Sequence, residues 1–253
     1  MPAMELLLTK SHHKILSMLS DGKRILQVHA EPEQTKEDKI FVGDIYVGKV
    51  RNVVKNINAA FVEFAKGQMG YLSLADKVVP LHTAGGRGDD RVLDEIIVQV
   101  KREALKTKPP ALSGAIDITG RYVVLTIGKK GCNISKKIRD KAVRSRLLEI
   151  LGEYEDPGYL LIARTNSAGV AEETLREEIE ALLKRYEKIT QQGIYRQPFQ
   201  CLEQAPPAYL ADIRDGYAEQ IERIVTDDEQ LYTQAETYLK EYSPQEQDKL
   251  VHW

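Results

Sequence analysis

The stretch from Ala59 to Leu72 constrains the fold more than any other part of the chain, because it places three aromatic rings on a hairpin punctuated by glycine. Gly67 and Gly70 mark the bends between its two short apolar runs. Phe61 and Phe64 are three residues apart, so in a strand their side chains face opposite ways. We therefore expect one ring to lie in a core and another at the surface.

Exposed rings beside basic residues are typical of a platform for single-stranded RNA. Phe61 and Tyr71 can stack on unpaired bases of any identity, and each stack contributes roughly 1–3 kcal/mol. Lys49, Arg51 and Lys108 supply positive charge for the phosphate backbone. The alternative interpretation is that the rings only fill the core of a small barrel.

The preceding segments, 42–50 and 53–64, read as alternating strands with glycine bends, which suits a five-stranded OB barrel. Ile45 to Val50 (IYVGKV), followed by Ala60-Phe61-Val62 and by Gly67 to Leu72 (GQMGYL), resembles the S1-type RNA-binding fold. We expect the last barrel strand at 95–103. The segment 80–94, which carries Gly85-Gly86-Arg87-Gly88, is expected to be a long loop.

Composition limits the class of protein. A length of 253 residues indicates more than one compact unit, and the net charge of −2 means that a nucleic-acid site must be a local patch. Positive charge is concentrated in residues 121–146, and negative charge in residues 198–253. Two cysteines exclude a disulfide framework and fit a reducing cytoplasm. We expect no signal peptide and no membrane span.

Both ends of the chain predict a small α+β unit. Strands are expected at 5–9, 15–19 and 25–29, and Asp21-Gly22 is a strong turn signal between the last two. Such a sheet is too small to be stable alone, so it needs a covering layer from elsewhere in the chain. Helices are expected at about 208–225 and 228–242, with an apolar stripe of Leu210, Ile213, Tyr217, Ile221 and Ile224.

Residues 114–200 predict an α/β sandwich, with strands at 122–126 and 159–163 and helices at 139–154 and 172–192. The turn at 128–131 and the segment 135–137, both rich in lysine, are expected to lie in one region. Arg164 and Thr165 follow the second strand, where a guanidinium and a hydroxyl can clamp a phosphate. The alternative is that Arg164 only ties down the neighbouring helix.

The order of these segments resembles the ribonuclease E/G family of bacterial endoribonucleases. The resemblance rests on Thr119 to Leu125 (TGRYVVL), Ile134 to Ile138 (ISKKI) and Ala163 to Gly169 (ARTNSAG), and it covers nearly the whole chain. It implies an α+β multidomain fold in which an S1-type barrel is inserted in an RNase H-like subdomain, beside an α/β 5′ sensor. The implied boundaries are 1–35 and 201–253 for the RNase H-like subdomain, 36–113 for the barrel and 114–200 for the sensor.

The resemblance also implies site residues. In the family the sensor recognises a 5′-monophosphate on RNA, and its pocket maps to Gly120, Val124, Lys136, Arg164 and Thr165. Lysine at position 136 replaces a family arginine, which keeps the charge but loses the bidentate fork. In the barrel, the RNA contacts map to Phe61, Phe64, Tyr71 and Lys108.

The family's catalytic subdomain, which binds magnesium through paired aspartates, would lie downstream of residue 253, as would the cysteines that share a structural zinc between subunits. We therefore expect a cytoplasmic, RNA-binding portion of the enzyme that holds no cofactor and does not cleave RNA by itself. Magnesium, zinc and homo-oligomerisation are implied only for a full-length enzyme. One alternative is a regulatory protein that binds RNA without cutting it.

A second alternative is a metal-dependent nuclease. The acidic residues that such a site would use are Asp212, Asp215, Asp227 and Asp228. Their helical setting instead favours a solvated face. His12 and His13 would point in opposite directions in an extended segment, so they are not expected to share a metal.

Overall fold

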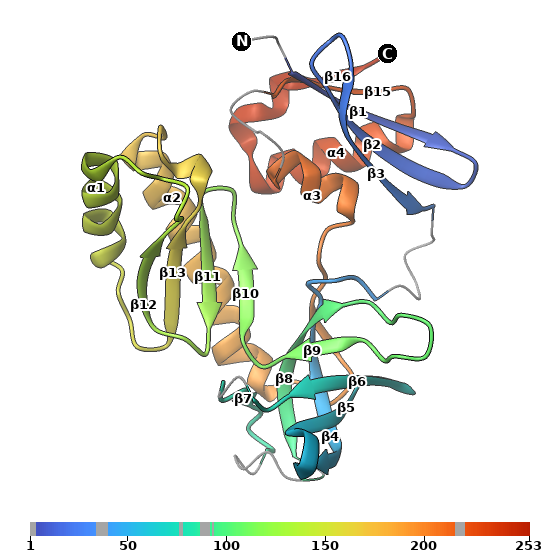
Figure 1. The fold of residues 1–253 in the computed structure, drawn as a ribbon, viewed down its shortest axis with the longest axis vertical. Helices are drawn as coiled ribbons and strands as arrows, with labels where there is room; N and C mark the ends of the chain where they lie inside the picture. Colours follow the sequence, from blue (N-terminus) through green and yellow to red (C-terminus); the bar gives the residue numbers. More distant parts are fainter. Residues whose placement is uncertain (1–3, 34–39, 76–77, 87–91, 93, 216–220) are drawn as a thin grey trace. The chain divides into compact units, whose positions relative to one another are not determined.

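The structure is a computed structural model that describes residues 4–33, 40–75, 78–86, 92, 94–215 and 221–253. The chain forms two compact units, and each is described by itself (Figure 1). The terminal unit combines the segment up to Lys39 with the segment from Pro206 to Trp253, and the central unit runs from Ile40 to Ala205. The predicted boundary between residues 35 and 36 lies outside the described residues.

The terminal unit is a five-stranded sheet in the order β16-β15-β1-β2-β3. Strands β1, β2 and β3 are antiparallel, whereas β15 runs parallel to both β1 and β16. The strands are β1 (Met4–Ser11), β2 (Lys14–Ser20), β3 (Ile25–Pro32), β15 (Ile221–Thr226) and β16 (Leu250–His252). The predicted hairpin turn before β3 is confirmed, because Asp21 accepts the backbone N–H groups of Lys23 and Arg24 and Gly22 adopts a φ of +79°.

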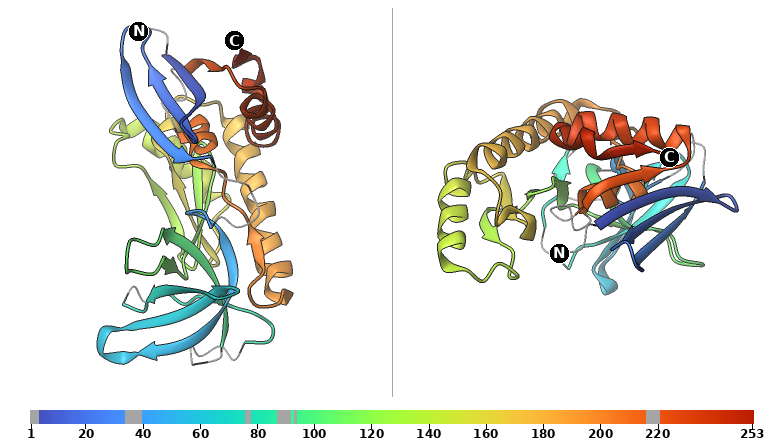
Figure 2. Two further views of the ribbon diagram at one scale, coloured as in Figure 1. Left: turned by 90° about the vertical axis from the view of Figure 1, so that its right-hand side faces the viewer. Right: turned by 90° about the horizontal axis from the view of Figure 1, so that it is seen from above.

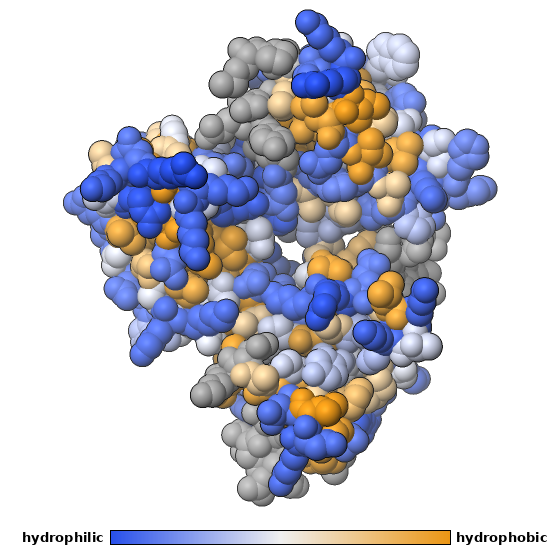
Figure 3. Space-filling model, in the orientation of Figure 1, coloured by the Kyte–Doolittle hydropathy of each residue, from blue (hydrophilic) through white to orange (hydrophobic). Residues whose placement is uncertain are grey.

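Helices α3 (Ala208–Asp215) and α4 (Glu229–Tyr242) cover one face of this sheet, which supplies the expected partner layer. Leu6, Leu8 and Leu19 point into the core that these helices close. Alternation along the strands places the other face away from the helices. Figure 3 shows apolar side chains gathered there, and the cross-strand row on that face is Val251, Val225, Leu7, Met18 and Val28.

One prediction for the terminal unit is wrong. The helix expected to reach residue 225 ends at Asp215, and Ile221–Thr226 is a strand that pairs with β1. Tyr217 of the predicted stripe lies outside the described residues. His12 and His13 lie between the expected strands, where both have positive φ, 49° and 60°, and form the tight turn between β1 and β2.

The central unit begins with a closed five-stranded barrel, which is compatible with the predicted OB fold. Its strands are β4 (Ile45–Val54), β5 (Ala59–Ala65), β6 (Gln68–Ser73), β8 (Glu95–Arg102) and β9 (Ala111–Ser113). Pairing of β4 with β8 closes the sheet. A Cβ at Gly48 would lie 2.5 Å from Val62, so only glycine lets β4 and β5 approach here.

The barrel differs from expectation at its end. The strand expected to be last, β8, is followed by β9, which pairs with both β6 and β8. Part of the predicted loop at 80–94 also joins the sheet, because β7 (Leu81–His82) pairs with β8. Residues 87–91 and 93 of that loop lie outside the described residues.

The rest of the central unit is an α/β sandwich with strand order β10-β11-β13-β12. Helices α1 (Lys141–Gly152) and α2 (Glu172–Glu187) pack on one face of the sheet (Figures 1 and 2). The strands are β10 (Ile116–Thr119), β11 (Val123–Ile127), β12 (Gly131–Ile134) and β13 (Tyr159–Ala163). Helices α1 and α2 confirm the two helices predicted for this segment. Strand β14 (Cys201–Glu203) then returns the chain to the barrel by pairing with β4.

Candidate nucleic-acid interface

On the outer surface of the barrel, two aromatic rings face each other. Phe61 on β5 pairs directly with Tyr71 on β6, and their ring centroids lie 6.1 Å apart at an interplanar angle of 76°. Both side chains are half-buried. The predicted opposition of Phe61 and Phe64 is confirmed, since Phe64 points inward and is completely buried beside Tyr46.

Phe64 is therefore a correction to the predicted RNA contacts. Its ring fills the barrel core together with Val50 and Val62, so it has no surface to offer a base. The physical reason is the two-residue period of β5, which turns Phe61 outward whenever Phe64 is inward.

The predicted basic residues differ in their surroundings. The Arg51 guanidinium is 2.6 Å from a carboxylate oxygen of Glu63, and it lies 5.8 Å from the ring centroid of Phe199. Lys49 is 3.6 Å from Glu95. The pKa of Glu63 is lowered by the hydrogen bond from the Gly67 N–H and by Arg51. The charges of Lys49 and Arg51 are thus partly balanced by neighbouring carboxylates.

Lys108 is exposed on the hairpin between β8 and β9. Two residues further on, the Pro110 carbonyl accepts the backbone N–H of Tyr71 at 2.8 Å. This bond anchors the Lys108 hairpin to the strand that carries one of the two outer rings. Phe61, Tyr71 and the hairpin of Lys108 therefore belong to one surface of the barrel.

The second set of predicted residues gathers at the end of β13. Arg164 donates from Nη1 to the Gly120 carbonyl at 2.7 Å, and its backbone N–H donates to the Tyr122 carbonyl at 2.7 Å. Thr165 is exposed, and its hydroxyl lies 3.1 Å from that of Ser135, the residue before Lys136. Parallel pairing of β12 with β13 produces this arrangement, because both strands end at the same edge.

Val124 lies on the face of the sandwich sheet opposite the helices. It is half-buried and pairs with Ile162 on β13 and with Thr119 on β10. The structure thus brings Gly120, Arg164 and Thr165 together, places Lys136 next to them along the chain through Ser135, and puts Val124 in the adjoining sheet face.

The lysine-rich turn at 128–131 does not join this group, so that expectation is wrong. Gly131 pairs with Leu160 near the start of β13, whereas Arg164 follows its end. Leu160 and Arg164 are four residues apart, which corresponds to roughly 13 Å at about 3.3 Å per residue. Only the segment 135–137 lies at the Arg164 end, and it precedes α1, which begins at Lys141 with Asp140 as its cap.

One residue close to this group has no counterpart in the sequence predictions. The Glu178 carboxylate of α2 accepts the backbone N–H groups of Arg121, Tyr122 and Val123 at 2.9, 2.7 and 2.7 Å. Burial raises the pKa of Glu178, while these hydrogen bonds and the charge of Arg164 oppose that shift. The sequence did carry one signal for this role: Glu178 directly precedes Ile179, a member of the apolar stripe of α2.

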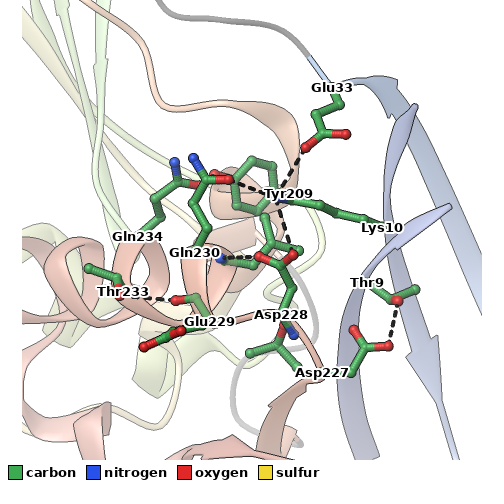
Figure 4. A network of polar contacts seen from close by, with 12 residues as sticks. Thr9, Lys10, Glu33, Tyr209, Asp227, Asp228, Glu229, Gln230, Thr233 and Gln234 are labelled. Atoms are coloured by element: carbon green, nitrogen blue, oxygen red, sulfur yellow. Dashed lines mark hydrogen bonds and ion pairs between the residues drawn. The ribbon is translucent and has the colours of Figure 1, made fainter. Parts of the chain in front are cut away.

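The acidic residues of the nuclease alternative are held by protein groups. Asp228 accepts the Leu231 N–H at the start of α4 and lies 3.2 Å from the ammonium of Lys10, and Asp227 accepts the Thr9 hydroxyl (Figure 4). Asp212 contacts Ser17 and His29, and Asp215 pairs with Arg214. Among the residues that the structure describes, no group of three or more His, Cys, Asp or Glu side chains is arranged to hold a metal ion.

Within the same described part of the chain, no helix has the length and apolar character needed to cross a membrane.

Comparison with known proteins identifies relatives of the chain. Residues 117–253 match the model of the ribonuclease E/G family. Ribonuclease E of Synechocystis sp. is 33% identical over 190 residues, which cover 74% of this chain and 28% of that protein. Ribonuclease G of Salmonella typhimurium is 28% identical over 248 residues, or 92% of this chain and 49% of that protein.

Ribonuclease G of Haemophilus influenzae is 27% identical over 275 residues, which cover 99% of this chain and 53% of that protein. The chain thus spans between about a quarter and a half of the length of these relatives. The family match covers more than half of the chain and agrees with the resemblance found in the sequence. The chain belongs to the ribonuclease E/G family.

Proposed function

We propose that this chain is the RNA-binding portion of an RNA-processing endoribonuclease, and that it holds single-stranded RNA on its barrel and the 5′-monophosphate of that RNA on its sandwich. The observation that carries the proposal is the pair formed by Phe61 and Tyr71 on the outer face of the barrel. Family membership supports it, since the relatives are named ribonucleases E and G.

The barrel surface favours unpaired RNA for a chemical reason. A ring can stack only on a base whose face is accessible, and bases in a duplex are stacked on their neighbours. Half-buried rings also keep a fixed orientation, so little side-chain entropy is lost when a base stacks on them. Lys108, together with Lys49 and Arg51, then contacts phosphates, and such contacts do not depend on the base sequence.

The end of β13 suits a terminal phosphate. A monophosphate at the 5′ end carries more negative charge and more acceptor oxygens than an internal phosphodiester. Arg164 can offer guanidinium donors there, Thr165 an exposed hydroxyl, and Lys136 an exposed ammonium group. Because lysine acts as a point charge, Lys136→Arg should strengthen phosphate binding by adding a bidentate fork.

RNA cleavage is not assigned to the acids of this chain. Asp212 contacts His29, and Asp227 accepts the Thr9 hydroxyl. Asp228 pairs with the Lys10 ammonium and caps α4 by accepting the Leu231 N–H. A magnesium site would have to displace those partners before it could activate water. We propose that this chain acts in the cytoplasm on single-stranded RNA.

The experiment that tests the proposal compares RNA structures on the purified chain. Fluorescence anisotropy would give the Kd of one labelled oligonucleotide alone and after it is annealed to its complement, at two salt concentrations. We expect tighter binding of the single strand at both concentrations, since stacking does not depend on counterion release. Equal affinity for the two forms would refute the barrel as a platform for unpaired bases.

A further inference from the structure

We propose that Glu178 is a positioning residue for the 5′-phosphate site: its carboxylate fixes the turn from Gly120 to Val123 and, through that turn, the direction in which Arg164 presents its guanidinium. This inference rests on the proposed function of the sandwich. It adds a residue from α2 to a site whose other members lie on the sheet edge and its loops.

The first observation is the number of donors on one carboxylate. Three successive backbone N–H groups, those of Arg121, Tyr122 and Val123, converge on Glu178. Consecutive backbone donors that point at one anion form a nest, an arrangement that proteins also use to bind phosphate and other anions. Here the anion in the nest is a side chain of the protein.

The second observation concerns Gly120. A Cβ at this position would lie 2.5 Å from a carboxylate oxygen of Glu178 and 2.9 Å from the Val123 carbonyl oxygen. The Gly120 N–H closes the turn by donating to the same Val123 carbonyl at 2.8 Å. Glycine is therefore needed because the turn passes directly over the carboxylate. The close approach of the turn to Glu178 thus depends on glycine at position 120.

The third observation is that Arg164 holds the same turn through its carbonyl groups. Its Nη1 donates to Gly120, its backbone N–H donates to Tyr122, and its charge attracts the Glu178 carboxylate. The turn is thus held through its N–H groups by Glu178 and through its carbonyl groups by Arg164. The hydrogen bond from Nη1 to Gly120 therefore ties the guanidinium of Arg164 to this turn.

Two effects of Glu178 on phosphate binding have opposite signs, which makes the inference testable. As a charge, the carboxylate weakens the attraction between Arg164 and a phosphate, so its neutralisation would strengthen binding. As a positioning group, it holds the donors in place, so its loss would weaken binding. Substitution of a residue that only stabilises the fold would leave the preference for a 5′-monophosphate over a 5′-hydroxyl unchanged.

The test uses one labelled oligonucleotide carrying either a 5′-monophosphate or a 5′-hydroxyl, with the ratio of the two Kd values as the readout. In Glu178→Gln we expect the preference for the monophosphate to fall by about tenfold, the size of one lost charge-assisted hydrogen bond. Affinity for the 5′-hydroxyl form should stay unchanged, because it depends on the barrel. Glu180→Gln, an exposed acid on the same helix, is the matched control and should keep the wild-type ratio.

A second variant separates position from charge and does not depend on Glu178→Gln being well folded. Glu178→Asp keeps the negative charge but shortens the side chain, which withdraws the carboxylate from the three backbone N–H groups, so it should lose the preference as well. An unchanged or increased ratio in folded Glu178→Gln would overturn the inference while leaving the phosphate site in place. A wild-type ratio of one would remove the phosphate site itself, and the inference with it.

Discussion

The rings of Phe61 and Tyr71 lie directly opposite each other on neighbouring strands, 6.1 Å between centroids and nearly perpendicular. An edge-to-face pair of this kind stabilises the orientation of both rings. It leaves each ring half-buried, with part of its surface accessible to a ligand. The same strand turns Phe64 into the core, so one short sequence supplies both a packed interior and an outer platform.

Removal of either outer ring should weaken binding to single-stranded RNA. For Phe61→Ala or Tyr71→Ala we expect a loss of roughly 1–3 kcal/mol, the contribution of one base stacked on an aromatic side chain. Fluorescence anisotropy with an unstructured oligonucleotide measures it. Trp253→Ala, which removes a ring that is 88% exposed at the end of the terminal unit, is the control and should bind like wild type. Wild-type affinity in both folded barrel variants would contradict the assignment.

Phe64 should affect stability instead. Phe64→Ala empties a completely buried site in the barrel, which typically costs about 3–5 kcal/mol in the free energy of unfolding. Urea denaturation followed by circular dichroism measures this loss. Phe61→Ala provides the comparison, since a half-buried ring leaves a smaller cavity and should cost less. Similar losses for the two variants would argue against the inward orientation of Phe64.

The sequence indicated local elements better than distant pairings. The alternation from Ile45 to Ala65 and the stripe of α2 depend on neighbours in the chain, and both elements formed as expected. Ile221, Ile224 and Val225 fit one face of a helix and also suit a buried strand, so periodicity alone could not decide between them. Pairing with β1, more than two hundred residues away, makes them a strand.

The candidate site shows the same limit. Arg164, Thr165 and Gly120 were expected together, and the end of β13 does bring them together. The contact of Glu178 with the turn before β11 spans more than fifty residues and depends on how α2 packs on the sheet. The lysine-rich turn at 128–131 was misplaced because the parallel pairing of β12 with β13 cannot be read from the chain.

Cys201 provides a test by pH. The residue is exposed, but partial burial of its thiol raises the pKa to about 11, and the nearby Asp44 carboxylate adds to the shift. Only the thiolate reacts with iodoacetamide, so in a Cys132→Ser variant the alkylation rate should keep rising with pH up to at least about pH 10. An ordinary thiol with a pKa near 8.5 is about nine-tenths ionised at about pH 9.5, so its rate would approach a plateau there. A plateau at that pH would contradict the described surroundings of Cys201.

The purified chain should bind RNA in magnesium without cutting it. Asp212 and Asp228 are occupied by His29 and Lys10, so neither is ready to bind a metal ion. Gel electrophoresis of a labelled oligonucleotide after incubation with magnesium checks this, with anisotropy on the same sample showing that the RNA is bound. Cleavage that disappears in Asp212→Asn or Asp215→Asn would favour the nuclease alternative.

The most direct test of the central claim is the affinity of the wild-type chain for one oligonucleotide sequence with two 5′ ends. Anisotropy with a 3′-labelled strand should show tighter binding of the 5′-monophosphate than of the 5′-hydroxyl form. Arg164→Ala should abolish the difference, because it removes the guanidinium donors, and should keep the affinity of the hydroxyl form. Equal binding of the two strands by the wild-type chain would contradict a 5′-phosphate site on the sandwich and leave the barrel as the RNA-binding surface.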